Sequence, residues 1–406
     1  MSPGGTSLAE LREPMDEKLP RGRRRGWRAG LPGGFIQFLI GLLWGLALPL
    51  GGLIYFVVGP GWVESDYSRG IYRLISWKVI PFTEQFGFSL SLVLTIALIV
   101  SLPLWWVVRW VQLFRRGEGF LAGLIWGPLR LLLIAPLLFV WFVSFWGTGY
   151  QRVPVAERLG LDTAKPEQAE VQQLLDSLHA VILRDLPKTP EQRDVGRAVA
   201  AISESMTAFI AESEGRTPRV PKRVKATPKG FLLFNSTSGI CSPFTLEANV
   251  DGAIPDTGFV YVAAHELAHT AGINLEGEAT LYGQIAGLRA DDAYARYCVA
   301  LDAYSDLARD LDKDARKAAM ERLPQESRDE LKHISEVSSS YNVRWFSKYS
   351  WKVYNSYLQS QGIKEGVRNY GESTRLFVFA SRKGLISLGD AAPAPVAEEV
   401  AAPAAG

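Results

Sequence analysis

Three long stretches without a charged residue dominate the first 150 positions of this chain of 406 residues. They extend from Phe35 to Val63, from Phe88 to Val108 and from Leu131 to Tyr150. A helix of about 20 apolar residues crosses the hydrocarbon core of a bilayer, where Pro103 is tolerated better than in a soluble helix. Three buried core helices are the alternative, but the recurrence of such long stretches leaves little room for it. The sequence therefore predicts a membrane domain over residues 35–150 with three transmembrane helices.

Positively charged residues flank these stretches unevenly. Clusters of arginine precede the first stretch and follow the second: Arg21, Arg23, Arg24, Arg25, Arg28, Arg109, Arg115 and Arg116. The connection at residues 59–87 is balanced in charge and rich in aromatic residues, which favours a helix in the membrane surface. Because Lys and Arg favour the cytoplasmic side, the N-terminus is expected there and the chain after residue 150 on the opposite side. We predict a multi-pass protein of the cell inner (cytoplasmic) membrane, with residues 1–34 as a disordered basic lead.

The segment FVYVAAHELAHTAGINLEGEATLY, residues 259–282, contains the residues that are best arranged for chemistry. His265 and His269 stand four positions apart in a stretch with helical character, so both imidazoles project from one face and can bind one cation. This pattern suits Zn²⁺, which takes a third protein ligand and leaves a position for water. Glu266 is then the expected general base. The alternative is a core helix with two buried histidines.

Two acids follow the turn at Gly272, and either could complete the site. In thermolysin-like zinc peptidases the glutamate ligand is followed four residues later by an Asp or Asn that supports a histidine. Thr280 stands at that offset from Glu276, whereas Tyr282 stands at that offset from Glu278. We expect Glu276 to be the third metal ligand, with Glu278 and Thr280 as an alternative ligand or as supporting residues.

The segment from Phe231 to Asp251 has strand and turn character and immediately precedes the histidine helix. An edge strand beside a metal can pair with the extended backbone of a peptide. Phe244 to Val250 is the candidate for that strand, with Glu247 and Asn249 as possible substrate-binding residues. An ordinary hairpin is an equally weighted alternative.

The rest of the chain carries less information about chemistry. A net charge of +2 argues against nucleic acid as a partner. Cys241 and Cys298 could pair outside the cytoplasm or remain as unpaired core residues. The aromatic residues of 341–382 are expected to serve a core, although one of them could donate a hydrogen bond at the site. Residues 389–406 are rich in Ala and Pro and are expected to be disordered.

The layout resembles a bacterial membrane family catalogued as a domain of unknown function, with three N-terminal spans and a zinc-peptidase-like HExxH. The resemblance covers about residues 35–385 and is carried by YSRGIYRLISWKVIPFTEQFGFSL, CSPFTLEANV, AAHELAHTAGINLEGEA, LRADDAYARY and VYNSYLQSQGIKEGVRNYG. It implies a membrane-anchored metallopeptidase of the thermolysin-like (gluzincin) type. The run Glu276, Gly277, Glu278, Ala279, Thr280 departs from the Glu-Ala-Asn that usually follows the glycine turn in such families.

These patterns together predict a mainly α protein, in which three transmembrane helices precede a helical zincin-like α+β catalytic domain with a small β element at 151–388. The expected function is zinc-dependent hydrolysis of peptide bonds in extracytoplasmic or membrane-proximal proteins, with a peptide or protein substrate and the lipid bilayer as partners. A zinc-binding membrane scaffold or sensor without catalysis is the alternative. A transporter is disfavoured because the three stretches contain almost no polar residues to line a path.

Overall fold

The computed structural model of the chain describes residues 35, 37–46, 59–115, 135–360, 372–386 and 388. The predicted lead at 1–34 and the predicted tail at 389–406 lie outside the described residues. The first predicted span is described only in part, and residues 131–134 of the third span also lie outside.

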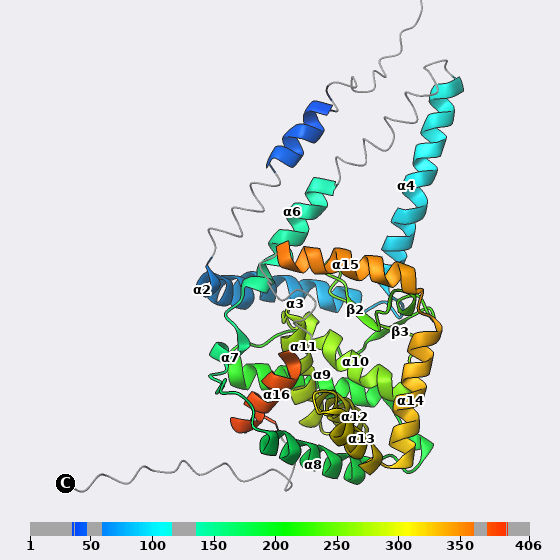
Figure 1. The fold of residues 1–406 in the computed structure, drawn as a ribbon. Helices are drawn as coiled ribbons and strands as arrows, with labels where there is room; N and C mark the ends of the chain where they lie inside the picture. The colour runs from blue at the N-terminus through cyan, green and yellow to red at the C-terminus, as the bar shows by residue number, and fades with distance from the viewer. Residues whose placement is uncertain are drawn as a thin grey trace, which may run out of the picture.

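Within the described ranges the protein is mainly helical with one small sheet, as the sequence predicts. One helix there, α4 (Leu90–Arg115), is long and apolar enough to cross a membrane, and its most apolar part is not buried. A shorter apolar helix covers Gln37–Leu46, and α6 covers Ala135–Phe145. These three helices extend from the same end of the helical domain (Figure 1).

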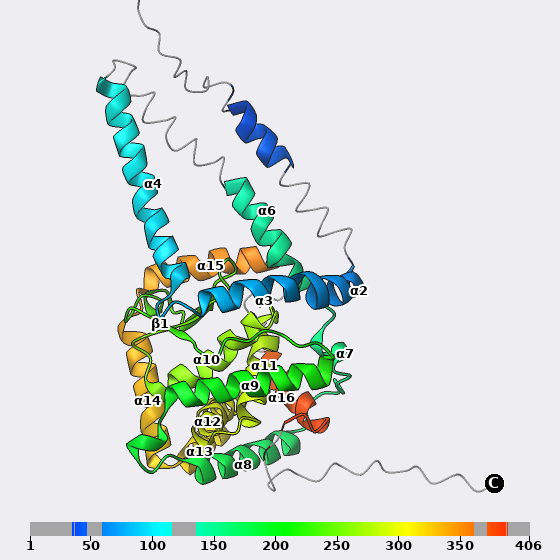
Figure 2. The same ribbon diagram turned by 180° about the vertical axis from the view of Figure 1, so that it is seen from behind.

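A helical rod lies across that end of the domain. It consists of α2 (Pro60–Trp62), the π-helical η1 (Val63–Ile71) and α3 (Tyr72–Thr83), and it runs beneath the three apolar helices (Figure 2). Val63 and Ile80 of the rod are fully buried, whereas Leu74 is exposed and Trp77, half exposed, donates to the Thr217 carbonyl at 3.4 Å. The rod therefore separates the apolar helices from the body of the domain.

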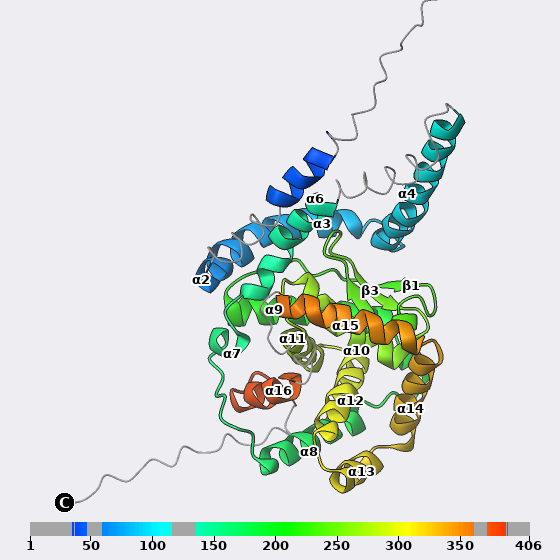
Figure 3. The same cartoon turned by 45° about the horizontal axis from the view of Figure 1, so that its top comes forward.

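The body of the domain begins at η2 (Gly147–Gln151) and consists mostly of helices. Its remaining helical elements are α7 (Val155–Arg158), α8 (Gln168–Asp185), η3 (Pro190–Gln192), α9 (Val195–Glu214), η4 (Leu233–Asn235), α10 (Asp256–Thr270), α11 (Glu276–Leu288), α12 (Ala293–Arg309), α13 (Lys313–Arg322), α14 (Gln325–Ser340), α15 (Arg344–Ser360) and α16 (Ser373–Arg382). Helix α11 is the central element, since every residue except Thr280 is buried, and it packs against α9, α10 and α12. Seen from the end that carries the apolar helices, α15 lies over α10 and α11 (Figure 3).

The sheet has three short strands in the order β1-β3-β2. Strand β3 (Ala248–Asp251) is central; β1 (Lys225–Thr227) pairs with it in parallel and β2 (Gly239–Cys241) in antiparallel orientation. The expectation of an edge strand at Phe244 to Val250 is wrong, because both sides of β3 are already paired. The edge strand that packs on α10 is β2.

Helix α15 also departs from the sequence prediction. Its aromatic residues were expected to serve a core, but Trp345 is 75% exposed and Tyr349 is 67% exposed. Trp351 and Tyr354, on the opposite side, are partly buried. The helix therefore packs on the domain with one face only.

Candidate metal centre

The two histidines lie one turn apart near the C-terminal end of α10, and the chain reverses directly after them. Gly272 has a φ of +83°, which suits glycine at the end of a helix. The hydroxyl of Tyr72 in α3 donates to the Thr270 carbonyl at 3.0 Å, and its ring lies where a Cβ on Gly272 would be. The helical rod thus holds the turn that follows His269.

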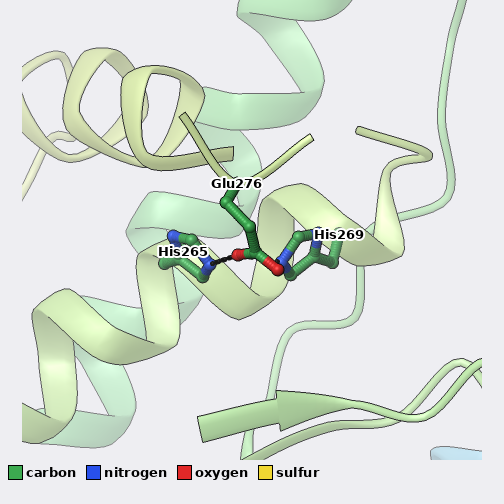
Figure 4. Close-up of side chains that lie close together, drawn as sticks. All are labelled: His265, His269 and Glu276. Carbon is green, nitrogen blue, oxygen red and sulfur yellow. Dashed lines mark hydrogen bonds and ion pairs between the residues drawn. The ribbon is translucent and has the colours of Figure 1, made fainter. Parts of the chain in front are cut away.

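The turn brings Glu276, the first residue of α11, back against both histidines (Figure 4). Its Oε2 lies 3.1 Å from Nε2 of His265 and 3.4 Å from Nε2 of His269. All three donor atoms lie within 4.8 Å of one another, so the group could hold a metal ion. A Cβ on Gly283 would come within 2.9 Å of the Ala264 backbone, so this glycine allows α11 to cross α10 closely beside His265.

Each of the three side chains has a second contact that orients it. Nδ1 of His265 lies 3.1 Å from the Thr280 hydroxyl, and Nδ1 of His269 lies 2.7 Å from the Ile273 carbonyl. A carbonyl accepts only from a protonated nitrogen, which leaves Nε2 of His269 for the Glu276 side. Tyr354 of α15 donates to Oε1 of Glu276 at 2.8 Å. Thr280 therefore stands at the supporting position that the sequence indicated.

The ionisation of this group reflects its burial. Burial raises the pKa of Glu276, but His269 and His265 outweigh this effect and hold that pKa well below its usual range. Burial lowers the pKa of His269, but the Glu276 carboxylate outweighs it and raises the pKa to about 9. The Glu276 carboxylate is therefore ionised and favours a positive charge on the group beside it.

Glu266 is 5% exposed and points toward the β2 side of α10. Its Oε2 has no hydrogen-bond partner in the described part of the chain, and burial raises the pKa of this carboxyl. A Cβ on Gly239 would approach Oε1 of Glu266 to 2.6 Å, so only glycine leaves room at that point of β2. A buried carboxyl with a raised pKa and one oxygen that has no hydrogen-bond partner can accept a proton from a bound molecule.

A cavity of about 490 Å³ opens beside these residues. It is bordered by His265 and Glu266 of α10, by Gly239 of β2 and by Trp351 of α15. The other polar residues of its lining are Thr280, Gln284, Asp302, Asp306 and Arg309. Gln284 is 4% exposed and its Oε1 is unpaired among the described residues, while burial raises the pKa of Asp302 to about 6. Gln284 and the two aspartates therefore offer hydrogen-bond acceptors to a molecule in the cavity.

Glu278, the alternative third ligand, is not brought to the histidines. Its carboxylate accepts from the backbone N–H of Val155 and from Arg158, each at 2.9 Å. Arg158 also lies 3.4 Å from Glu214, which forms ion pairs with Arg152 as well. Glu278 therefore belongs to a buried ion-pair network, and Glu276 is the acid of the candidate metal site.

Glu247 and Asn249 are buried, and neither borders the cavity. Glu247 accepts from the backbone N–H of Leu90 at 2.9 Å and of Ser91 at 2.6 Å, and it pairs with Lys225. The Asn249 amide donates to the carbonyl of Glu247 at 2.9 Å. The structure therefore places both residues at the start of the apolar helix α4, where Glu247 caps its first turn.

Sequence reasoning did not select Tyr354 or the backbone of β2 as parts of the site. A tyrosine-rich helix indicated that one aromatic hydroxyl could reach it, but nothing in the local pattern distinguishes Tyr354 from its neighbours. Gly239 carries a weak signal, because a glycine within a strand often marks a close approach of another group.

The fold and the site define a mainly helical protein with a candidate membrane helix and a buried His-His-Glu cluster. The chain belongs to the family described as protein of unknown function (DUF3810), whose model matches residues 67–378. The expected resemblance to a family of unknown function is thus confirmed. No curated protein and no solved structure is significantly similar to the chain.

Proposed function

We propose that the protein is a membrane-anchored, zinc-dependent metallopeptidase. The observation that carries this proposal is the convergence of His265, His269 and Glu276 at the edge of a cavity, next to the buried Glu266 carboxylate, whose Oε2 is unpaired among the described residues. A core helix with two incidental histidines would not need an acid from another helix between them. Nor would it need a second buried acid with an unpaired oxygen.

The donor set fits zinc on chemical grounds. Two imidazole nitrogens and one carboxylate oxygen are typical ligands of catalytic zinc, whereas Mg²⁺ and Ca²⁺ favour oxygen ligands alone. Tetrahedral zinc with bonds of about 2.0–2.1 Å requires donors about 3.3 Å apart. The two distances to Oε2 of Glu276, 3.1 and 3.4 Å, are close to that spacing, and all three donor atoms lie within 4.8 Å of one another.

The residues around the ligands suit peptide hydrolysis. Zinc at this site would supply a Lewis acid and lower the pKa of a water molecule to about 7. Oε2 of Glu266 would take the proton of the attacking water and deliver it to the leaving amine. Tyr354 and Thr280 would keep Glu276 and His265 in the orientation that binding requires.

Strand β2 offers a place for an extended substrate. At the two ends of the β2–β3 pair, the Asp251 N–H donates to the backbone carbonyl of Ser238 at 2.9 Å, and the Ser242 N–H donates to the backbone carbonyl of Glu247 at 3.0 Å. Because hydrogen-bonded and non-bonded pairs alternate in an antiparallel ladder, the backbone groups of Gly239 and Cys241 point away from β3. A substrate backbone could pair with the groups of Gly239, which borders the cavity beside Glu266, while a backbone hydrogen bond of Cys241 already reaches Glu266.

The proposal includes the number of membrane spans and their orientation. Helix α4 is supported as a span by its length and composition, and the apolar stretches that include Gln37–Leu46 and α6 extend from the same end of the domain. We propose three spans, a cytoplasmic N-terminus and an extracytoplasmic metal site. A reporter fused after residue 388 that is active only outside the cytoplasm tests this orientation.

The enzyme proposal is tested with purified full-length protein. Wild type is expected to contain one zinc ion per chain and to cleave peptides, His265→Ala to lose both properties, and Glu266→Gln to keep zinc and lose cleavage. Equal zinc content in wild type and His265→Ala would refute the metal site. Zinc-loaded wild type that cleaves no peptide would refute catalysis and favour a scaffold that zinc stabilises, whereas equal cleavage by wild type and Glu266→Gln would refute the role of Glu266 as the base. The contact of Tyr354 with Glu276 gives that alternative a basis, since it ties α15 to the site.

A further inference from the structure

Helix α15 carries two adjacent stripes on its exposed face. Trp345, Tyr349 and Val353 recur every four residues and are 75%, 67% and 52% exposed. One position before each of them stands a basic residue, Arg344, Lys348 or Lys352, and all three are exposed. The helix contains no acidic residue. An apolar aromatic stripe beside a cationic stripe is the pattern of helices that lie in a membrane surface.

The opposite face of α15 explains why this exposure is not a packing defect. Ser347 is buried, Trp351 borders the cavity and donates to the Asn235 carbonyl at 3.2 Å, and Tyr354 donates to Glu276. The helix is thus held on the domain by specific contacts. On the other side Trp345 and Tyr349 remain mostly exposed within the described ranges, although the Trp345 ring contacts that of Phe346.

The position of α15 in the fold indicates what covers that face. The helix lies at the same end of the domain as the rod of α2, η1 and α3, which is the end from which α4 and α6 extend (Figures 1 and 2). The rod exposes Trp62 and Leu74, which are 42% and 65% exposed. Trp and Tyr are enriched at membrane–water boundaries. The rod and α15, which are far apart in sequence, both expose aromatic residues at the end of the domain from which the apolar helices extend.

We propose that α15 is seated in the surface of an anionic phospholipid bilayer, with Trp345, Tyr349 and Val353 among the lipid headgroups and Lys348 and Lys352 on their phosphates. Each basic residue near such a surface strengthens the electrostatic attraction of the helix to anionic lipids, and the apolar stripe determines how deeply the helix is buried in the surface. This inference does not depend on zinc or on catalysis. It makes the membrane surface a structural partner of the helix that covers the metal site.

The test uses the full chain in lipid nanodiscs, with an environment-sensitive NBD label on Tyr349→Cys. Cys241 and Cys298 are buried, and burial raises the pKa of both thiols, so the introduced cysteine reacts first. Val353→Cys provides a second labelled position. The matched control is Lys317→Cys on α13, an exposed site at the opposite end of the domain (Figure 1).

In nanodiscs that contain phosphatidylglycerol, the labels at 349 and 353 are expected to emit at shorter wavelength than the label at 317. Headgroup-attached nitroxide lipids should also quench them several-fold more strongly. Charge reversal by Lys348→Glu with Lys352→Glu should reduce that quenching. The same charge change on α13 and α14, by Lys317→Glu with Lys332→Glu, should not.

Three outcomes decide the proposal. Lipid quenching at both positions that falls on charge reversal of α15 supports it. Solvent-like emission at both positions, equal to that at 317, overturns it and leaves the stripe for a protein partner. Quenching that is the same with and without phosphatidylglycerol, and unaffected by charge reversal, overturns the assignment of an anionic surface. Glu266→Gln protein should give the wild-type result, which keeps this test separate from the test of catalysis.

Discussion

Replacing Glu214 by Gln should destabilise the protein far more than the loss of an ordinary ion pair. Its carboxylate side chain is 1% exposed and lies among Arg152, Arg158 and Arg216, whose side chains are 2%, 4% and 5% exposed. Glu64 and Glu278 are the other acids of this network. The substitution therefore leaves three buried guanidinium groups with two carboxylates.

The size of the effect follows from that imbalance. Removal of one partner from a buried ion pair costs about 3–5 kcal/mol, because the remaining charge stays out of water without compensation. For a domain of about 200 residues, 1 kcal/mol corresponds to a shift of about 2–4 °C in Tm, so Glu214→Gln should lower Tm by roughly 6–20 °C. The matched control is Glu212→Gln on the same helix. Glu212 is 64% exposed and pairs with Arg289, and such a pair contributes about 0–1 kcal/mol.

Thermal unfolding of the full chain in detergent, followed by circular dichroism, measures both variants against wild type. Arg152 and Arg216 also donate to the carbonyls of Gly272 and Ala271, at 3.2 and 2.7 Å, in the turn after His269. We therefore expect Glu214→Gln to weaken zinc binding as well. Equal Tm shifts for the Glu214 and Glu212 variants would show that the buried network contributes no more than a surface pair.

Stability in acid, zinc affinity and peptide cleavage should each respond to a single substitution. Burial raises the pKa of Glu214, but the three arginines outweigh this effect and hold the pKa far below 4.5. The stabilisation from this ionised carboxylate is complete above pH 4.5 and declines as pH falls further. The difference in Tm between wild type and Glu214→Gln should therefore narrow in acid, and a constant difference would contradict this expectation. Gly239→Ala should remove peptide cleavage and retain zinc, because the new Cβ would displace Glu266; unchanged cleavage would contradict that. Tyr354→Phe should weaken zinc affinity roughly tenfold in a competitive chelator titration, since it removes the hydrogen bond to Glu276, the proposed metal ligand, and wild-type affinity would disprove the role. Asp302→Asn should lower kcat/KM roughly tenfold for peptides with a basic side chain relative to a neutral one; an unaltered ratio would show that Asp302 does not contact substrate.

Local spacing predicts the centre of the site well. Helical periodicity places His265 and His269 on one face, and Gly272 indicates the turn that brings Glu276 back. These inferences succeed because all the interacting groups lie within a dozen residues of one another. The choice of Glu276 over Glu278 rested on the offset to Thr280, and the structure shows that hydroxyl beside His265.

Contacts between distant segments could not be predicted in the same way. Glu247 has the sequence context of a substrate-binding residue, but its partners are two backbone N–H groups more than 150 positions earlier. Strand order in a sheet of three- and four-residue strands depends on pairing that alternation cannot reveal. The two faces of α15 are both rich in Trp and Tyr, so composition did not indicate which face packs on the domain.

The cap that Glu247 forms on α4 fixes the distance between the candidate metal site and the start of the apolar helix. It joins the first turn of the apolar helix to the residue next to the central strand β3, so the sheet and that helix form one mechanical unit. A site fixed in this way stays at a constant height above the point where α4 starts. In the proposed membrane-anchored peptidase, this fixed height would determine which peptide bonds of a neighbouring chain can reach the site. The position of a bond would then select it for cleavage before the side chains around it are recognised.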